Sequence, residues 1–428
     1  MQKIKELYKY FLLSDGVVTD SRKDVKNKIF FALTGDNFDG NKFASDALMK
    51  GAKLCVIDDE SLKIDDGYFF VPDVLDALQK LAKHHRKESS TTVFAITGTN
   101  GKTTTKELIS LILSNHVNII STEGNLNNHI GVPLTLLDIE GDTKIAVVEM
   151  GANHIGEIQK LCEIAQPDVG LITNIGKAHL EGFGSFDGVI TAKNEMYEYL
   201  RENNGVAIVN SDDLLLKDLS KNIKQFNYGT KDANVVGEVI ASKPSLKIKW
   251  THGKKVNEFT SQLYGKYNFD NLLGAIATCI YFGVPDKDIN KAIAGYIPKN
   301  NRSQKITTEF NNIIMDAYNA NPTSMNEAIV SFFEHDFKDS WFILGDMFEL
   351  GDYSINEHQL IVDHLVKEGA TNVILIGKDF SKIQSNSYLT FRTTDEALSY
   401  LMTNKIKKGN ILIKGSRGMK LERLLEAL

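Results

Sequence analysis

Short apolar runs rich in β-branched residues alternate with helix-length segments along most of this chain, and this alternation constrains the fold most. A strand that is apolar on both faces must be covered on both faces, which occurs in parallel sheets whose strands are joined by helices. The alternation therefore predicts an α/β fold. The runs are residues 93–97, 145–149, 169–173 and 206–210 in the middle of the chain and 312–316, 341–345, 372–377 and 411–415 near its end.

A glycine-containing turn, GTNGKTTT (98–105), stands between the first of these runs and an apolar helical pattern. Gly101, Lys102 and Thr103 fit the end of the phosphate-loop pattern G-x-x-x-x-G-K-[ST], although Ile96 occupies the position of its first glycine. A strand-to-helix turn points the helix N-terminus at an anion. We expect Lys102 on the β- and γ-phosphates of a nucleotide and the Thr103 hydroxyl on Mg²⁺. The plainer alternative is a capped helix after a glycine turn.

Two polar stretches, residues 83–92 and 295–304, divide the 428-residue chain into three segments. This length suits two to four domains at roughly 150 residues each. We predict an α/β protein of three domains, two of which carry the parallel sheets. The three domains are a small mixed α/β N-terminal domain (1–88), a central nucleotide-binding domain of P-loop type with a mostly parallel sheet (89–297) and a C-terminal Rossmann-like α/β domain (298–428).

Three further side chains are candidate ligands. Glu149 ends the strand run after the phosphate loop, and this position favours a metal-binding role over that of an exposed cap. His179 lies in a loop with several glycines, where a single histidine is more often simply solvated. Lys193 lies in residues 192–200, which look like the beginning of a helix, and a lysine there would ordinarily be on the surface.

Asparagines gather in two places. Asn125, Asn127 and Asn128 occupy one loop, where they suit either a neutral polar ligand or turn formation. Asn268 and Asn271 are three residues apart and so share one face of a predicted helix. They suit either an adenine edge or a helix cap, and the residues alone favour the cap.

The last segment places polar loops after three of its strand runs. Asp316 ends one run, and the loops at 345–351 and 414–422 follow two others. Ligands of open α/β sheets bind at the carboxyl ends of the strands. We therefore expect one substrate surface formed by the three loops, the first of which also carries Tyr318, Asn319 and Asn321.

The composition argues against several classes of partner. The formal net charge is −6 and no block of Lys or Arg occurs, so we expect neither nucleic acid nor a membrane as partner. No stretch approaches the roughly 20 apolar residues of a membrane span, and the first apolar run is too short for a signal peptide. The 3 cysteines are widely spaced, which suits a reducing compartment. We expect a cytoplasmic protein.

Taken together and in order, the motifs resemble the Mur ligases of bacterial cell-wall synthesis. The resemblance runs from TDSRK (19–23) to the end of the chain, and it accounts for Ile96 because the family's phosphate loop reads TGTNGKTT or close to it. The matching motifs are TGTNGKTTTKE, GNLNNHIGVPLTLL, EMGANHIGEI, TNIGKAHLEGFGS, DAYNANPTSM, GDMFELG and KGSRGMKLE.

Within the family, the chain is most similar to the branch that adds D-alanyl-D-alanine to UDP-N-acetylmuramoyl-tripeptide. The resemblance implies that ATP phosphorylates the tripeptide carboxylate and that the dipeptide amine then attacks the acyl phosphate. ATP, two Mg²⁺ ions and the two substrates are the implied ligands, and we expect a monomer.

The resemblance also implies roles for individual residues. It makes Lys102, His179 and Lys193 catalytic, with Lys193 carbamylated by CO₂. Thr103 and Glu149 would hold the first metal, and His179 with the modified Lys193 the second. The residues implied to bind ATP are Gly98, Thr99, Asn100, Gly101, Lys102, Thr103, Thr104, Asn268 and Asn271, together with Arg302 and Asp316 of the last domain.

The implied substrate contacts spread over all three domains. Those at the UDP end are Asp20, Ser21, Arg22, Asp39 and Gly40; those near the sugar and peptide are Asn125, Asn127 and Asn128; those near the dipeptide are Tyr318, Asn319 and Asn321.

The chain departs from the family pattern at two positions, and other functions compete with this one. The family often has histidine where this chain has Tyr267 and Asn41. A sister ligase adds the third amino acid, but its Asn-Pro-Arg signature is missing here. Folate polyglutamating ligases share the phosphate loop but lack GNLNN and DAYNANP. A nucleotide switch or binding module is the alternative from another class, and its Asn-Lys-x-Asp signature is also missing.

Overall fold

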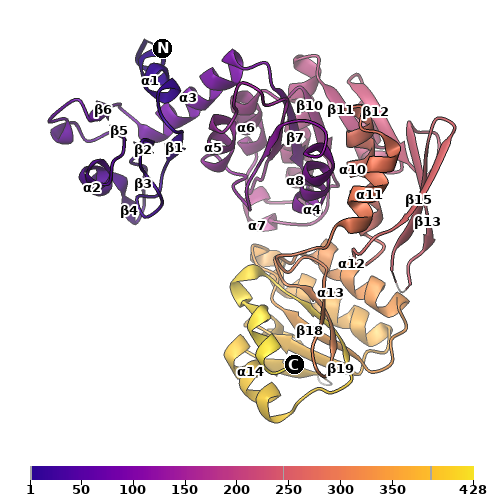
Figure 1. Ribbon diagram of the computed structural model, residues 1–428. Helices are drawn as coiled ribbons and strands as arrows, with labels where there is room; N and C mark the ends of the chain where they lie inside the picture. Colours follow the sequence, from indigo (N-terminus) through magenta and orange to yellow (C-terminus); the bar gives the residue numbers. More distant parts are fainter. Residues whose placement is uncertain (1, 244, 386–387) are drawn as a thin grey trace.

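The computed structural model describes residues 2–243, 245–385 and 388–428. Its strands form three main sheets, of 4, 9 and 6 strands in chain order. The N-terminal sheet projects to one side of the central one, and the C-terminal sheet lies beneath the central one in the view of Figure 1. Most neighbouring strands are parallel, so the predicted three-part α/β architecture is confirmed.

The N-terminal sheet is parallel throughout, with the order β1-β2-β5-β6. A short antiparallel pair, β3 with β4, stands apart from it. The strands are β1 (Val17–Val18), β2 (Ile29–Phe31), β3 (Thr34–Gly35), β4 (Phe38–Asp39), β5 (Leu54–Ile57) and β6 (Tyr68–Phe70), and the helices are α1 (Gln2–Leu12), α2 (Ala44–Met49) and α3 (Val74–Glu88).

The central sheet has the order β15-β14-β13-β12-β11-β10-β7-β9-β8. It is parallel from β8 to β13, after which β14 and β15 continue it in antiparallel fashion. Its strands are β7 (Thr92–Thr97), β8 (Ile119–Ser121), β9 (Ile145–Glu149), β10 (Val169–Ile172), β11 (Val206–Asn210), β12 (Lys224–Gly229), β13 (Val235–Ala241), β14 (Lys247–His252) and β15 (Lys255–Thr260).

Helices cover both faces of this sheet, which explains why its inner strands are apolar throughout. Phe94 and Ile96 of β7 pack in one cluster with α4 and α10, whereas Val93 and Ala95 face a second cluster that includes α3, α5, α6 and α8. The helices are α4 (Lys102–Leu113), α5 (Gly131–Leu137), α6 (Glu157–Ala165), α7 (Leu180–Phe183), α8 (Phe186–Glu202), α9 (Leu214–Leu219), α10 (Asn268–Tyr281) and α11 (Asp286–Gly295).

The C-terminal sheet has the order β16-β17-β21-β18-β19-β20 and is parallel except for β16. Helices α12 and α13 pack on one face, while α14 packs on the other. The elements are β16 (Gln304–Thr307), β17 (Asn312–Asp316), α12 (Pro322–Glu334), β18 (Ser340–Gly345), α13 (Ser354–Lys367), β19 (Asn372–Ile376), β20 (Leu389–Phe391), α14 (Thr394–Thr403) and β21 (Asn410–Lys414).

Candidate active site

A cavity of about 900 Å³ lies where the central and C-terminal sheets face each other. Its walls come from the carboxyl ends of strands in both sheets, which is where open α/β sheets bind ligands. The predicted site residues that line it are Thr99, Asn100, Gly101, Lys102, Thr103, Thr104, Asn125, Asn127, Asn128, Glu149, His179, Asn268, Asn271, Arg302, Asp316, Tyr318, Asn319 and Asn321.

Two glycines give the phosphate loop its shape. Gly98 has φ +140° and a Cβ there would lie 2.0 Å from Thr173 Oγ1. Gly101 has φ +79° and a Cβ there would lie 2.0 Å from Asn271 Oδ1. Only glycine fits such positions without displacing a neighbour. Because Gly101 is also the N-cap residue of α4, the first N–H groups of that helix point toward the cavity unobstructed by a capping side chain.

Lys102 is held by its own loop. Its Nζ donates to the carbonyl oxygens of Gly98 (2.6 Å) and Thr99 (3.0 Å). Burial lowers the pKa of Lys102 to about 8, an effect that Glu149 opposes and Arg302 reinforces. The side chain therefore remains mostly a cation at neutral pH, beside the N-terminus of α4.

Glu149 is 1% exposed at the end of β9, so the alternative of an exposed cap is wrong. Its Oε1 accepts from Asn127 Nδ2 (2.8 Å) and from Thr103 Oγ1 (3.2 Å). Its buried Oε2 lacks a hydrogen-bond donor within the described chain and lies 3.6 Å from Lys106 Nζ.

A carboxylate oxygen with spare capacity beside a threonine hydroxyl fits Mg²⁺, which prefers oxygen ligands. Over the ranges that the structure describes, no group of three or more His, Cys, Asp or Glu is arranged to hold a metal. Mg²⁺ commonly binds through one or two carboxylates with water and substrate phosphates. The residues present fit such an ion when a nucleotide completes the site.

Lys106 is a buried polar residue beside Glu149 that was not predicted from the sequence. It is 3% exposed, and its Nζ donates to the carbonyl oxygens of Thr122 (2.7 Å) and Gly124 (3.2 Å). It thus ties α4 to the start of the asparagine loop and lies beside Glu149. The available signal was its spacing of four from Lys102, which puts both lysines on one face of the helix.

The three asparagines of the loop divide between the two interpretations left open above. Asn128 Oδ1 accepts from the backbone N–H groups of Ile130 (3.1 Å) and Gly131 (2.9 Å), which is turn chemistry. Asn127 instead reaches Glu149. All three asparagines, Asn125 among them, still line the cavity.

His179 makes a contact between domains, so simple solvation does not describe it. Its Nδ1 faces Glu349 Oε2, which belongs to the loop after β18. The close contact with His179 lowers the pKa of the Glu349 carboxyl. Half of that carboxylate remains exposed, whereas the histidine side chain is 24% exposed.

Lys193 lies in the middle of α8 and is 2% exposed, which corrects both expectations about it. The helix begins at Phe186, where Ser185 accepts from the N–H of Gly188, and not at residue 192. Lys193 Nζ lies 5.5 Å from the centre of the Phe183 ring and has no hydrogen-bond or ion-pair partner among the described residues. Burial, reinforced by the nearby Lys102, lowers the pKa of Lys193 to about 7.

Asn268 and Asn271 bond to one another and not to the helix end, so the favoured cap interpretation is wrong. Asn271 Nδ2 donates to Asn268 Oδ1 (2.9 Å), and Thr105 Oγ1 donates to Asn271 Oδ1 (3.3 Å). Asn268 Nδ2 donates to the carbonyl of Tyr264 (2.7 Å). Within the described chain, α10 lacks a side-chain cap. The pair joins α10 to α4 at the edge of the cavity.

The C-terminal wall carries an ion pair and a stacked arginine. Asp316 accepts from Lys414 Nζ (2.6 Å), and the Arg302 guanidinium lies 3.6 Å from the centre of the Tyr318 ring. Asn321 caps α12 and its Nδ2 also donates to Asn100 Oδ1 of the phosphate loop (2.8 Å). Lys414 was not predicted individually, although its loop was.

The expected single surface of three loops is only partly right. The cavity is lined by Asp316, Tyr318, Asn319, Asn321 and Lys414, whereas the loop at 345–351 contacts the His179 loop instead. Gly98, at the start of the phosphate loop, and Lys193 of α8 are not among the residues that line the cavity.

The five residues predicted for the UDP end lie in the N-terminal region, outside the cavity. Arg22 donates to both Asp20 oxygens (2.8 Å each), and this pair is exposed next to Ser21. Asp39 Oδ1 accepts from the Asn41 N–H (3.1 Å). A Cβ at Gly40 would lie 2.5 Å from the backbone of Ala32, so the turn requires glycine.

Known proteins match this chain along nearly its whole length. The Mur ligase middle domain matches residues 96–279, and the Mur ligase, glutamate ligase domain matches residues 301–417. The UDP-N-acetylmuramoyl-tripeptide–D-alanyl-D-alanine ligase of Bacillus subtilis is 34% identical, with 96% of this chain and 93% of that protein aligned.

Solved structures agree. MurF from Acinetobacter baumannii has a TM-score of 0.88 at 30% identity, covering 99% of this chain and 97% of that one. The MurF ligase of Thermotoga maritima in complex with ADP has a TM-score of 0.86 at 27% identity, covering 97% of each chain. These matches identify an ATP-dependent, ADP-forming ligase. The chain belongs to the Mur ligase family.

Proposed function

We propose that this enzyme joins D-alanyl-D-alanine to the free carboxylate of UDP-N-acetylmuramoyl-tripeptide, with ATP as the energy source. One observation carries the proposal: a phosphate loop and a polar wall from another domain face each other across one cavity. A ligase of this kind needs such a cavity, because ATP, an acid and an amine must meet in one place. The full-length similarity to D-alanyl-D-alanine-adding relatives supports the choice of substrates.

The first chemical task is to bring two anions together. The carboxylate oxygen attacks the γ-phosphorus of ATP, the bond to the leaving ADP oxygen breaks, and an acyl phosphate forms. Lys102 and the N–H groups of α4 stabilise the negative charge on the phosphates. The dipeptide amine then attacks the acyl carbon, loses a proton and expels phosphate, which leaves the amide.

Mg²⁺, when bound, supplies further neutralisation of the phosphates. We assign Thr103 and Glu149 to a first ion and His179 with Lys193 to a second. Carbamylation of Lys193 forms a bond from the deprotonated Nζ to the carbon of CO₂. Starting from the ammonium, two protons are released, so a buried cation becomes an anion. The burial of Lys193 without a carboxylate partner in the described chain supports this assignment.

The proposed division of labour follows the three domains, with boundaries at 1–88, 89–297 and 298–428. The N-terminal domain binds the UDP end, the central domain binds ATP, and the C-terminal domain receives the dipeptide. The enzyme acts as a cytoplasmic monomer. No helix in the described ranges has the length and apolar character of a membrane span.

The test measures phosphate release by the purified chain. We expect release only when ATP, the muramoyl-tripeptide and D-alanyl-D-alanine are all present, with one ligated product formed per phosphate. Release without either substrate would support a nucleotide switch instead. Ligation of a free amino acid to the muramoyl-dipeptide would support the sister ligase.

A further inference from the structure

His179 and Glu349 meet across the boundary between the central and C-terminal domains. His179 Nδ1 faces Glu349 Oε2, and the Glu349 carbonyl also accepts from the N–H of Glu181 (3.2 Å). Both partners have left-handed backbones, with φ 50° at His179 and φ 62° at Glu349. Such conformations are uncommon outside glycine, so the surrounding structure holds each side of this contact in place.

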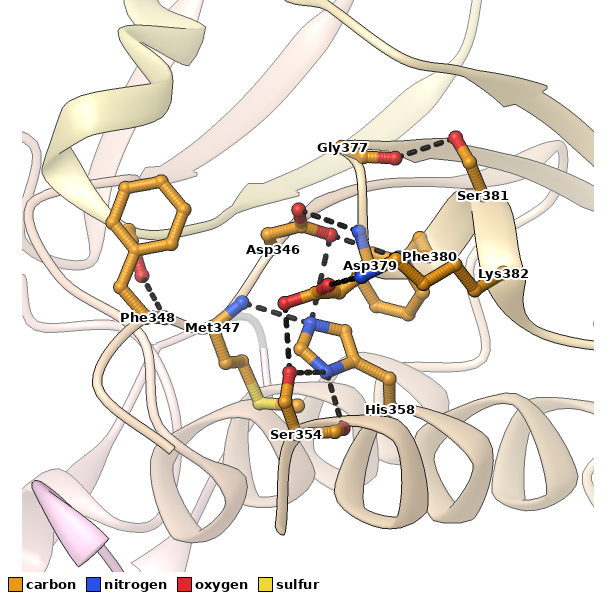
Figure 2. A network of polar contacts seen from close by, with 11 residues as sticks. Asp346, Met347, Phe348, Ser354, His358, Gly377, Asp379, Phe380, Ser381 and Lys382 are labelled. Carbon is orange, nitrogen blue, oxygen red and sulfur yellow. Dashed lines mark hydrogen bonds and ion pairs between the residues drawn. The ribbon is translucent and has the colours of Figure 1, made fainter. Parts of the chain in front are cut away.

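A buried polar network fixes the loop that carries Glu349 (Figure 2). His358 of α13 is fully buried; its Nε2 accepts from the Met347 N–H (3.0 Å), and its Nδ1 lies 2.7 Å from the Ser354 carbonyl. Asp346 accepts from the N–H groups of Asp379 (3.0 Å) and Phe380 (2.9 Å). The residues on either side of the Glu349 loop are thereby tied to two neighbouring elements.

Other contacts join the same two segments without touching His179. Lys177 Nζ donates to Glu357 Oε1 (2.7 Å), and the Tyr353 hydroxyl donates to the Gly184 carbonyl (3.3 Å). The loop around His179 is therefore held by several C-terminal residues. Only Glu349 among these contacts reaches the imidazole.

A carboxylate at Nδ1 determines what the other ring nitrogen can do. A hydrogen bond from Nδ1–H fixes the proton on that nitrogen and leaves the Nε2 lone pair available. Histidines that bind metals commonly have their second nitrogen oriented in this way by a carboxylate. His179 lines the cavity. Its Nε2 is therefore the atom that would bind the second metal under the proposed function.

We propose that Glu349 is a positioning residue that sets the tautomer and orientation of His179, so that the C-terminal domain completes a site of the central domain. The proposal rests on the proposed function. It makes the second metal site dependent on domain docking, whereas the site at Thr103 and Glu149 lies within the central domain.

The test is a titration with Mn²⁺, followed by electron paramagnetic resonance, in the presence of a non-hydrolysable ATP analogue and the muramoyl-tripeptide. We expect Glu349→Ala to weaken one of two bound Mn²⁺ ions about tenfold and to leave the other unchanged. Glu349→Gln retains an acceptor oxygen, so its loss stays within about threefold. Glu349 is half-exposed, so these changes spare the core.

Two comparisons separate positioning from simple docking. Tyr353→Phe and Glu357→Gln remove other interdomain contacts and leave Mn²⁺ affinity within about twofold. In a His179→Ala background, Glu349→Ala has no further effect, since the second change acts only through the first residue.

An unchanged affinity in Glu349→Ala, an equal loss in the Tyr353 variant, or additive losses in the double variant would each overturn the proposal. If the unaltered chain binds Mn²⁺ normally but does not join the dipeptide to the muramoyl-tripeptide, the proposed function is overturned. The Mn²⁺ affinities of the Glu349 variants then still decide whether Glu349 positions His179. Ligation by the unaltered chain, with Mn²⁺ binding insensitive to Glu349→Ala, would overturn positioning alone.

Discussion

Lys102 stands at the N-terminus of α4, where the helix and the ammonium together favour negative charge. We expect Lys102→Ala to lower kcat on the order of a hundredfold or more, because the transferring phosphoryl group loses a cation aimed at it. Steady-state phosphate release measures this effect. Lys217→Ala, at an exposed site on α9, serves as the control; activity of the Lys102 variant within a fewfold of the unaltered enzyme would disprove the role.

Lys193 offers a second prediction at the scale of one residue. Lys193→Ala removes the side chain that becomes an anion after carbamylation, so we expect an inactive enzyme. Acetate or formate, supplied at high concentration, should restore part of the activity by occupying the vacated space as a carboxylate. The Lys102→Ala variant should gain nothing from the same additions. If the Lys193 variant also gains nothing, carbamylation loses its support.

The site residues that were predicted correctly have neighbours that are close to them in the sequence, whereas the others have partners that are distant in the sequence. Gly101, Lys102 and Thr103 belong to one strand-to-helix turn, whose chemistry is evident from adjacent letters. The pairing of Asn271 with Thr105 joins residues 166 positions apart, so a spacing of three could not distinguish it from a cap. The burial of Lys193 was hidden because the true N-cap, Ser185, lies well before the stretch that looked helical.

At the scale of elements, the loop after β18 depends on a histidine that never reaches solvent. We expect His358→Ala to speed amide hydrogen exchange across residues 346–350, since the buried Met347 N–H loses its acceptor. Mass spectrometry of exchanged peptides measures this. Asn356→Ala, exposed on the same helix, should leave exchange in the loop unchanged. Equal exchange in both variants would show that other contacts hold the loop.

Elements were predictable where both faces of a strand are buried. Strands β9, β11 and β17 fall where apolar runs indicated, because only covered parallel strands lack polar residues so completely. The hairpin of β14 and β15 was missed. Its strands mix lysines and glutamates with apolar residues, because one face of the hairpin is exposed to solvent. The sequence therefore contains no continuous apolar run there.

At the scale of the whole molecule, one substrate must reach two separated places. The UDP end is assigned to residues such as Asp20 and Asp39, whereas its carboxylate must reach Lys102. We expect the radius of gyration from solution X-ray scattering to fall when an ATP analogue and the muramoyl-tripeptide are added together, as the domains close on them. In this closure we expect Arg302 and Asp316 to approach the nucleotide from the last domain. Identical profiles with and without both ligands would contradict closure.

Contacts between domains were the part of the site least visible in the sequence. The Asn321–Asn100 bond links positions 221 residues apart, and the His179–Glu349 pair joins two loops of different sheets. Each loop was predicted to be polar, but a local sequence pattern does not indicate which two loops contact each other. Only the packed arrangement of three domains supplies that information.

The two carbonyl oxygens that accept from Lys102 Nζ satisfy this buried ammonium within its own loop. If Lys102 contacts the phosphates as proposed, a triphosphate must displace these two hydrogen bonds. Part of the attraction between the nucleotide and the cation would then only replace acceptors that the loop already provides.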